Sequence, residues 1–219
     1  MKIKNIIFDL DGTLIDSSEG VVEAVNYSLR MTGQPEQSPE KIKPFIGYSL
    51  KVMYPEFTDA PLEDLYRHFQ TKAAESVVSS TVVLDGAEET VRRLAGEGYS
   101  LAIASTKIKY HIERIVTKFD WRKLFRTWAG GDEVTEVKPD PEILHLVLER
   151  LGADPAETMV VGDTVNDIIA ARAVPMRAVA IASPYGGQGD LKNSQPDYFL
   201  ESIDELPALV EKINNGAVK

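Results

Sequence analysis

From residue 83 onward, apolar segments with the length of strands alternate with segments that have helical periodicity. Short apolar runs occupy residues 100–104, 159–162 and 177–182. Between these runs, apolar residues recur every three or four positions, which is the spacing of one helix face. Because parallel strands are joined by long crossovers, usually helices, this order predicts an α/β fold. We expect a doubly wound parallel sheet with helices on both faces.

The first strand of the sheet is predicted at residues 2–10, where apolar residues run without clean alternation. Residues 16–82 interrupt the pattern, because helix-start signals and helical spacing recur there and we predict no strand among them. The sequence therefore predicts two parts. Residues 1–15 and 83–219 form a Rossmann-like core, and residues 16–82 form an inserted helical domain.

The composition excludes several classes of function. The chain has 219 residues, with 34 Asp and Glu against 24 Lys and Arg, and its net charge is −10. A chain this acidic is poorly suited to nucleic acid or to an anionic membrane. It has no cysteine, which excludes disulfides and cysteine nucleophiles. The apolar run that ends at Asp9 is too short for a signal peptide or a membrane span. We expect a cytoplasmic protein that binds neither nucleic acid nor membrane.

Polar residues stand where the predicted strands end. In open parallel sheets the ligand crevice lies outside the carboxyl ends of the strands, so these residues are expected to converge. Gly12 and Gly162 stand among them and let the main chain approach a ligand. The polar residues are Asp9 and Asp11 after the first strand, Ser105 and Thr106 after the run 100–104, Lys138 before a predicted helix start, and Asp163 after the run 159–162.

This set of side chains favours phosphoryl transfer assisted by a cation. Two carboxylates about 4 Å apart repel by roughly 4 kcal/mol at an effective dielectric constant of about 20, so Asp9, Asp11 and Asp163 require a proton or a cation between them. Mg²⁺ suits an all-oxygen site that a substrate phosphate completes. One carboxylate can then form an aspartyl-phosphate, while a second transfers protons. Ser105, Thr106 and Lys138 would neutralise the phosphate oxygens.

Four segments together resemble the motifs of the haloacid dehalogenase-like hydrolase superfamily, in the family's order and spacing. The insert is similar to the four-helix cap of that superfamily. A second acid after the nucleophile, here Asp11, implies phosphate rather than halide chemistry. The four matching segments are Asp9-Leu10-Asp11-Gly12-Thr13, Ser105, Lys138-Pro139 and Gly162-Asp163-Thr164-Val165-Asn166-Asp167.

The resemblance implies a role for each matching position. Asp9 would be the nucleophile and Asp11 the general acid and base. Magnesium would be held by the Asp9 and Asp163 carboxylates and by the main-chain carbonyl of Asp11. Asp167 would be a further acid near the metal or Lys138, although Thr164 and Asp167 also have the spacing of a helix capping box. The substrate would be bound by Gly12, Thr13, Ser105, Thr106 and Lys138.

The C-terminal part, with Tyr185-Gly186 and Pro196-Asp197-Tyr198, resembles the phosphoglycolate phosphatase and pyrophosphatase subgroup. A small phosphorylated metabolite is the implied substrate, phosphoglycolate first and inorganic pyrophosphate next, for a monomer or homodimer. A sugar-phosphate mutase uses the same core residues and stays an alternative, although the loop 45–51 lacks the arginine-and-acid signature expected of β-phosphoglucomutases. Receiver domains share the strand-end chemistry, but within a much shorter chain that has no inserted domain.

Several other polar residues have no assigned role. Lys107 flanks the second motif and is compatible with a solvated position at a helix start. His68, His111 and His145 are isolated, and we expect them on the surface or on helix faces. Tyr48, Lys43 and Lys51 of the insert either contact substrate or form a solvated surface.

Overall fold

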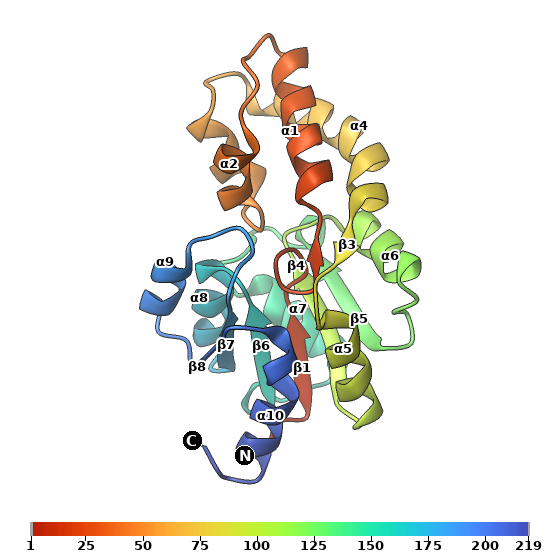
Figure 1. The fold of residues 1–219 in the computed structure, drawn as a ribbon, viewed down its shortest axis with the longest axis vertical. Coiled ribbons are helices and arrows are strands. Elements are labelled where there is room, and N and C mark those ends of the chain that lie inside the picture. The colour runs from red at the N-terminus through yellow and green to blue at the C-terminus, as the bar shows by residue number, and fades with distance from the viewer. Residues whose placement is uncertain (1, 219) are drawn as a thin grey trace.

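The computed structural model describes residues 2–218 and contains a six-stranded parallel sheet (Figure 1). Every neighbouring pair of strands in this sheet runs parallel, which confirms the predicted fold class. The strands, in their order across the sheet, are β5 (Phe125–Gly130), β4 (Ser100–Ser105), β1 (Asn5–Phe8), β6 (Thr158–Gly162), β7 (Arg177–Ile181) and β8 (Tyr198–Leu200).

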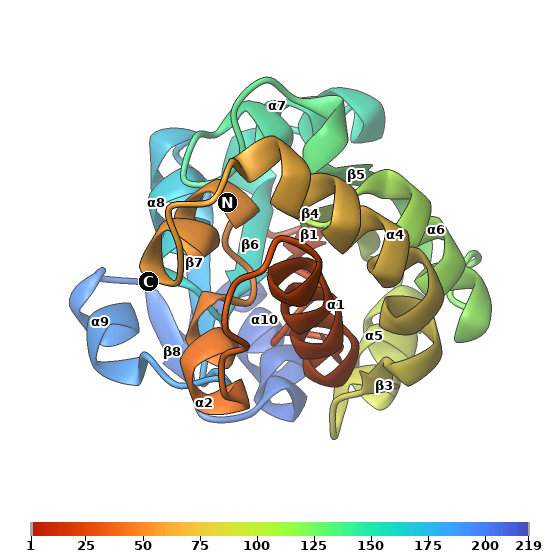
Figure 2. The ribbon, with the colours of Figure 1, turned by 90° about the horizontal axis from the view of Figure 1, so that it is seen from above.

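Helices cover both faces of the sheet, and the alternation of side chains along each strand explains how. Ile6 and Phe8 of β1 pack into the hydrophobic cluster on one face, while Ile7 packs into the cluster on the other. Viewed from above, the two sets of helices lie on opposite sides of the strands (Figure 2). One face carries α5 (Ala87–Gly96), α6 (Lys109–Lys118) and α10 (Leu206–Asn214); the other carries α7 (Glu142–Leu151), α8 (Val165–Ala173) and α9 (Gln188–Asn193).

Residues 18–80 form a separate helical layer above the carboxyl ends of the strands (Figure 1). The layer has its own hydrophobic cluster, which includes Val25 and Leu29 of α1 and Leu65 and Val77 of α4. Its helices are α1 (Ser18–Met31), α2 (Pro39–Ile42), α3 (Leu50–Met53) and α4 (Leu62–Ser80), with short 3₁₀ turns at Lys43–Phe45 and Tyr54–Glu56.

A short antiparallel ribbon joins the helical layer to the rest of the chain. The strands β2 (Ile15–Asp16) and β3 (Val82–Val83) pair with each other at this junction. The expectation of no strand within residues 16–82 is therefore wrong at both ends of that segment. Strands of two residues are too short to show a period of two, so no sequence pattern identifies them.

Among residues 2–218, no helix combines the length and apolarity needed to cross a bilayer.

Candidate active site

Asp9 lies at the centre of the strand ends and is held by Lys138. The Asp9 carboxyl follows β1 and is 2% exposed. The Lys138 ammonium donates to Asp9 Oδ1 at 2.5 Å, to Asp167 Oδ1 at 2.5 Å and to the carbonyl oxygen of Ala104 at 3.0 Å. All three donor positions of the buried ammonium are therefore used. Burial alone would lower the pKa of Lys138, but the carboxylates of Asp167 and Asp9 hold it above its usual value.

Asp167 has both of the roles that the sequence left open. Its Oδ1 atom accepts from Lys138, as described above. Its Oδ2 atom accepts from the main-chain N–H of Thr164 at 3.1 Å and from the Thr164 hydroxyl at 2.6 Å, so the residue also forms the capping box of α8. The start of α8 thereby fixes the carboxylate that orients Lys138.

Asp163 faces Asp9 from the end of β6. Its Oδ1 atom accepts from the Thr13 hydroxyl at 3.0 Å, and its Oδ2 atom accepts from the Ser183 hydroxyl at 2.7 Å. Gly12 passes so close that an added Cβ would lie 2.1 Å from Asp163 Oδ2, and its φ of +83° also favours glycine. The Thr13 hydroxyl therefore supports Asp163, and a role of Thr13 in substrate binding stays a prediction.

Asp11 has partners of its own on the side of the site that faces the helical layer. Its carboxylate accepts from the Ser17 hydroxyl and pairs with the Lys107 ammonium at 3.1 Å. The Lys107 side chain is only 8% exposed, so it is not a solvated residue at a helix start. This contact fixes the orientation of Asp11 independently of the Lys138 network.

Ser105 and Thr106 end β4 in different surroundings. Ser105 is buried, and its hydroxyl accepts from the main-chain N–H of Lys107 at 3.2 Å. The Thr106 hydroxyl donates to the carbonyl oxygen of Gly47 in the helical layer at 3.0 Å. Thr106 thus contacts the helical layer directly, and its role in substrate binding stays a prediction.

The carboxylates form a strongly negative cluster. Asp9, Asp11, Asp163 and Asp167 are all buried and face two ammonium groups, those of Lys138 and Lys107, which leaves two negative charges if every group is ionised. Burial raises the pKa of Asp9 to about 7, against the lowering effect of Lys138. Burial and the Asp9 and Asp167 charges raise the pKa of Asp163 well above its usual value. We call Asp9, Asp11, Asp163, Asp167 and Lys138 the strand-end cluster.

The donor set of this cluster fits a hard divalent cation. Within the described part of the chain, oxygen atoms of Asp9, Asp163 and Asp167 lie within 4.8 Å of one another. Of the buried side-chain nitrogen and oxygen atoms in residues 2–218, only Asp9 Oδ2 has no hydrogen-bond partner. An unpartnered buried carboxylate oxygen is costly, and coordination by a cation would remove that cost. The Asp11 side chain lies outside this group.

Sequence reasoning missed three residues that shape the site. Ser17 and Lys107 bind Asp11, and Ser183 binds Asp163. Lys107 directly follows two assigned positions, so its place in the loop after β4 was the available signal. Nothing in the local sequence distinguishes Ser17 or Ser183. His111 lines a cavity and is 4% exposed, and its burial, with the nearby Lys107 and Arg114 charges, lowers its pKa to about 4.

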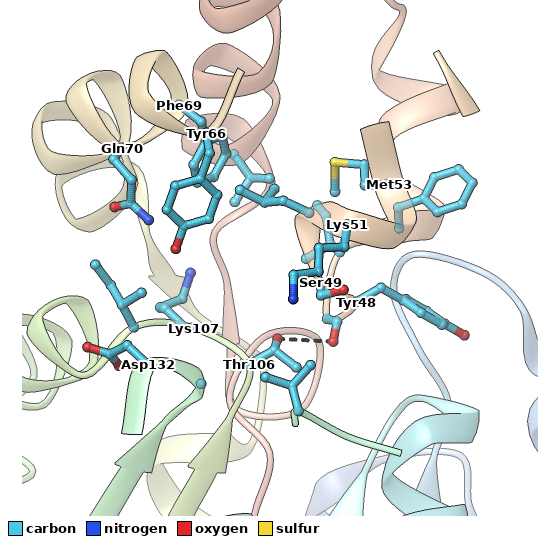
Figure 3. Close-up of a pocket in the computed structure, with 18 of the residues that line it drawn as sticks. Tyr48, Ser49, Lys51, Met53, Tyr66, Phe69, Gln70, Thr106, Lys107 and Asp132 are labelled. Atoms are coloured by element: carbon cyan, nitrogen blue, oxygen red, sulfur yellow. Dashed lines mark hydrogen bonds between the residues drawn. The ribbon is translucent and has the colours of Figure 1, made fainter. Parts of the chain in front are cut away.

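A cavity of about 620 Å³ lies between the helical layer and the segments that follow β4 and β5, which contribute Lys107 and Asp132 (Figure 3). Asp11 is the member of the cluster that lines it. Thr106 and Lys107 form part of its lower wall, and Tyr66 and Phe69 of α4 form part of its upper wall (Figure 3). Tyr48 and Lys51 also line it, whereas Lys43 does not. The cavity is therefore open to the predicted acid and base and is closed above by the helical layer.

Comparisons with known proteins agree with this geometry. Residues 6–181 match the family described as haloacid dehalogenase-like hydrolase. The chain is 31% identical over 217 residues to pyrophosphatase PpaX of Bacillus mycoides, covering 98% of this chain and 100% of that protein. It is also 31% identical over 208 residues to "Probable phosphatase IndB" of Dickeya dadantii, covering 92% of this chain and 90% of that protein.

A solved structure shows the same fold. A protein of Haemophilus somnus described as a predicted phosphoglycolate phosphatase superposes with a TM-score of 0.84 at 25% identity, covering 95% of this chain and 98% of that chain. The chain belongs to the haloacid dehalogenase-like hydrolases. Within that family it is a phosphatase related to the phosphoglycolate phosphatase subgroup.

Proposed function

We propose that this phosphatase is Mg²⁺-dependent and hydrolyses a small phosphomonoester through an aspartyl-phosphate at Asp9. The observation that carries the proposal is the asymmetry of the Asp9 carboxylate. Lys138 holds its Oδ1 atom, while its Oδ2 atom is buried without a partner. The Lys138 ammonium thus fixes one oxygen of Asp9. The other oxygen has no hydrogen bond and is free to bind a metal ion or to attack a phosphorus atom.

Two proton transfers complete the reaction, and we assign both to Asp11. In the first step an Asp9 oxygen forms a bond to phosphorus, and the bond from phosphorus to the ester oxygen breaks. Asp11 gives its proton to the departing alkoxide. In the second step Asp11 takes a proton from a water molecule, whose oxygen attacks phosphorus and releases Asp9 and inorganic phosphate. Ser17 and Lys107 hold Asp11 in position at the side of the cluster that lines the cavity.

The residues that would hold Mg²⁺ are the Asp9 and Asp163 carboxylates and the main-chain carbonyl of Asp11. When bound, the ion would neutralise charge on the phosphate and on the nucleophile. Asp167 lies within the same group of acids, but its two oxygens are already bound to Lys138 and Thr164. We therefore assign Asp167 to orienting Lys138 beside the metal. Ser105 and Lys138 would bind the phosphate oxygens.

We further propose that residues 16–82 act as a cap over a core of residues 1–15 and 83–219. The ribbon of β2 and β3 is the connection about which such a cap would move. The names of the relatives include a pyrophosphatase and a predicted phosphoglycolate phosphatase, and both substrates are candidates. A cytoplasmic location and a monomeric or homodimeric state stay predictions.

The test is hydrolysis of p-nitrophenyl phosphate with and without Mg²⁺, in the native protein and in Asp9→Asn. Asp9→Asn keeps the shape of the side chain and removes the nucleophile. We expect both the substitution and metal removal with EDTA to abolish turnover, with activity restored by Mg²⁺ only in the native protein. Turnover by Asp9→Asn would contradict the nucleophile assignment, and turnover in EDTA would contradict the metal assignment.

A further inference from the structure

The cavity beneath the helical layer has two chemically different walls. The wall nearest the sheet carries polar and charged side chains, namely Asp11, Thr106, Lys107, His111, Asp132 and Glu136. The opposite wall comes from the helical layer and is mainly apolar, although it also carries Ser49, Lys51, Glu63 and Gln70. We call six of its large apolar or aromatic side chains the roof: Phe45, Leu50, Met53, Leu62, Tyr66 and Phe69.

Most of the roof is incompletely buried within the helical layer. Phe45, Leu50, Leu62 and Phe69 pack against the cluster of that layer but remain only partly buried, and Tyr66 is 43% exposed. Their free surface faces the cavity, as Figure 3 shows for Tyr66 and Phe69. Apolar surface that a ligand covers adds favourable free energy in proportion to the area removed from water. The roof is therefore a surface that an apolar group would stabilise.

The size of the cavity points in the same direction. Its volume is about 620 Å³. At about 30 Å³ for each molecule of liquid water, that volume corresponds to about 20 water molecules. Phosphoglycolate and pyrophosphate each have only about nine non-hydrogen atoms and would leave more than half of the cavity to water. Neither molecule has apolar surface that matches the roof.

The position of Asp11 sets how a substrate would lie. Asp11 is the proposed proton donor to the leaving group, and it lines the cavity. A phosphomonoester with its phosphate at Asp9 would therefore direct its organic part past Asp11 and toward the roof. The side chain of Lys107, held on Asp11 at 3.1 Å, would lie beside the ester oxygen rather than against the organic part.

We infer that the preferred substrates are phosphomonoesters whose leaving group carries an apolar ring, with the roof as the determinant of specificity. This inference rests on the proposed function and adds the substrate class to it. An apolar ring covers the partly exposed roof, and the cavity has room for it beyond the ester oxygen. Phosphoglycolate and pyrophosphate are then weaker substrates.

The test compares two esters with the same type of alkoxide leaving group, n-propyl phosphate and 3-phenylpropyl phosphate, in the presence of Mg²⁺. We expect kcat/KM for the phenylpropyl ester to be higher by roughly 10- to 100-fold, the factor for moving one phenyl ring from water into an apolar site. It should also exceed kcat/KM for phosphoglycolate and pyrophosphate. Equal kcat/KM values for the two esters would overturn the inference and leave the proposed function intact.

Substitutions of Tyr66 test whether the roof causes the preference for the phenylpropyl ester. Tyr66→Ala should lower the preference for the phenylpropyl ester about tenfold, whereas Tyr66→Phe should keep it, because the ring rather than the hydroxyl is needed. The matched control is Tyr110→Ala, which removes a 53% exposed tyrosine that does not line the cavity and should leave the preference unchanged. Equal losses in Tyr66→Ala and Tyr110→Ala would contradict the role of the roof. Failure of the native protein to hydrolyse either ester would contradict the proposed function and this inference with it.

Discussion

The two sides of the cavity differ in how their side chains are held. In the strand-end cluster, the side chains are fixed by short hydrogen bonds and ion pairs, as in the bonds from Lys138 to Asp9 and Asp167. In the roof, residues such as Phe69 and Leu62 are held by apolar packing alone and keep free surface toward the cavity. In the proposed function, the rigidly held cluster would perform the chemistry, and the roof would select the substrate through shape and apolar area.

The largest effect is expected for a substitution of Lys138 in the strand-end cluster. Lys138→Met leaves the buried carboxylates of Asp9 and Asp167 without their cation. We expect p-nitrophenyl phosphate hydrolysis to fall about 1000-fold and the free energy of unfolding to fall by about 3–5 kcal/mol. Enzyme assays and denaturant unfolding measure the two quantities. Lys109→Met, at a lysine with a 40% exposed side chain, is the control, and a loss of similar size there would contradict the assignment.

A smaller effect is expected at Lys107, which touches the cluster only through Asp11. Lys107→Met should lower kcat by roughly 10- to 100-fold for an alkyl phosphate, because Asp11 would lose the orientation that its proposed role as proton donor requires. The loss should be smaller for p-nitrophenyl phosphate, whose leaving group departs without protonation. Steady-state kinetics on both esters check this expectation. Equal losses for the two esters would show that Lys107 acts on something other than proton transfer.

The hydroxyl that supports Asp163 should affect the metal more than the chemistry. Ser183→Ala removes the donor to Asp163 Oδ2 and leaves the donor from Thr13 in place. We expect about tenfold weaker Mg²⁺ activation with nearly unchanged kcat at saturating Mg²⁺, since such supporting contacts tune metal affinity. Activity titrated with Mg²⁺ measures both quantities. Unchanged Mg²⁺ activation would contradict a role of the Ser183 hydroxyl in metal affinity.

The smallest effect is a dependence of stability on pH in the metal-free protein. The folded-state pKa of Asp9, about 7, lies above the ordinary 3.8, so the folded state keeps a proton that the unfolded state releases. This contribution to stability is complete below about pH 4 and is lost as the pH rises to about 7. We expect the Tm in EDTA to fall by a few degrees between pH 5.5 and pH 7.5, and Mg²⁺ to reverse the fall.

Asp9→Asn is the control for this pH effect. His111 contributes with the opposite sign, because burial lowers its pKa to about 4 and its stabilisation is lost as the pH falls below its ordinary value. The difference between native protein and Asp9→Asn therefore removes the His111 part and reports Asp9 together with the effect of its charge on the pKa of Asp163. An identical change of Tm with pH in both proteins would contradict the raised pKa of Asp9.

The same comparison explains what the sequence could predict. Asp9, Asp163 and Lys138 were found because each follows or precedes a recognisable element, and a parallel sheet brings such positions to one edge. Lys107 and Ser183 were given no role because their contacts depend on side-chain direction, which local pattern does not fix. Asp167 could not be assigned uniquely, and the structure explains this, since one carboxylate oxygen caps α8 and the other binds Lys138.

The sequence predicted the helices of the helical layer but not which of their side chains line the cavity. Helical spacing predicted helices within residues 16–82, yet it did not show that Leu65 is buried while Phe69 lines the cavity. That distinction depends on where α4 lies relative to the loop after β4. The two-residue strands β2 and β3 were missed because strands of that length carry no periodic signal.

The central claim is that Asp9 becomes phosphorylated during turnover. Asp11→Asn removes the group that would activate water, while p-nitrophenolate can still leave without a proton. In this variant with Mg²⁺ we expect a burst of about one nitrophenolate for each protein molecule, followed by slow turnover. After acid quenching, mass spectrometry should find phosphate on the peptide that contains Asp9, and borohydride reduction should convert residue 9 to homoserine. A burst that leaves phosphate on another residue, or steady turnover with none bound to the protein, would contradict the account.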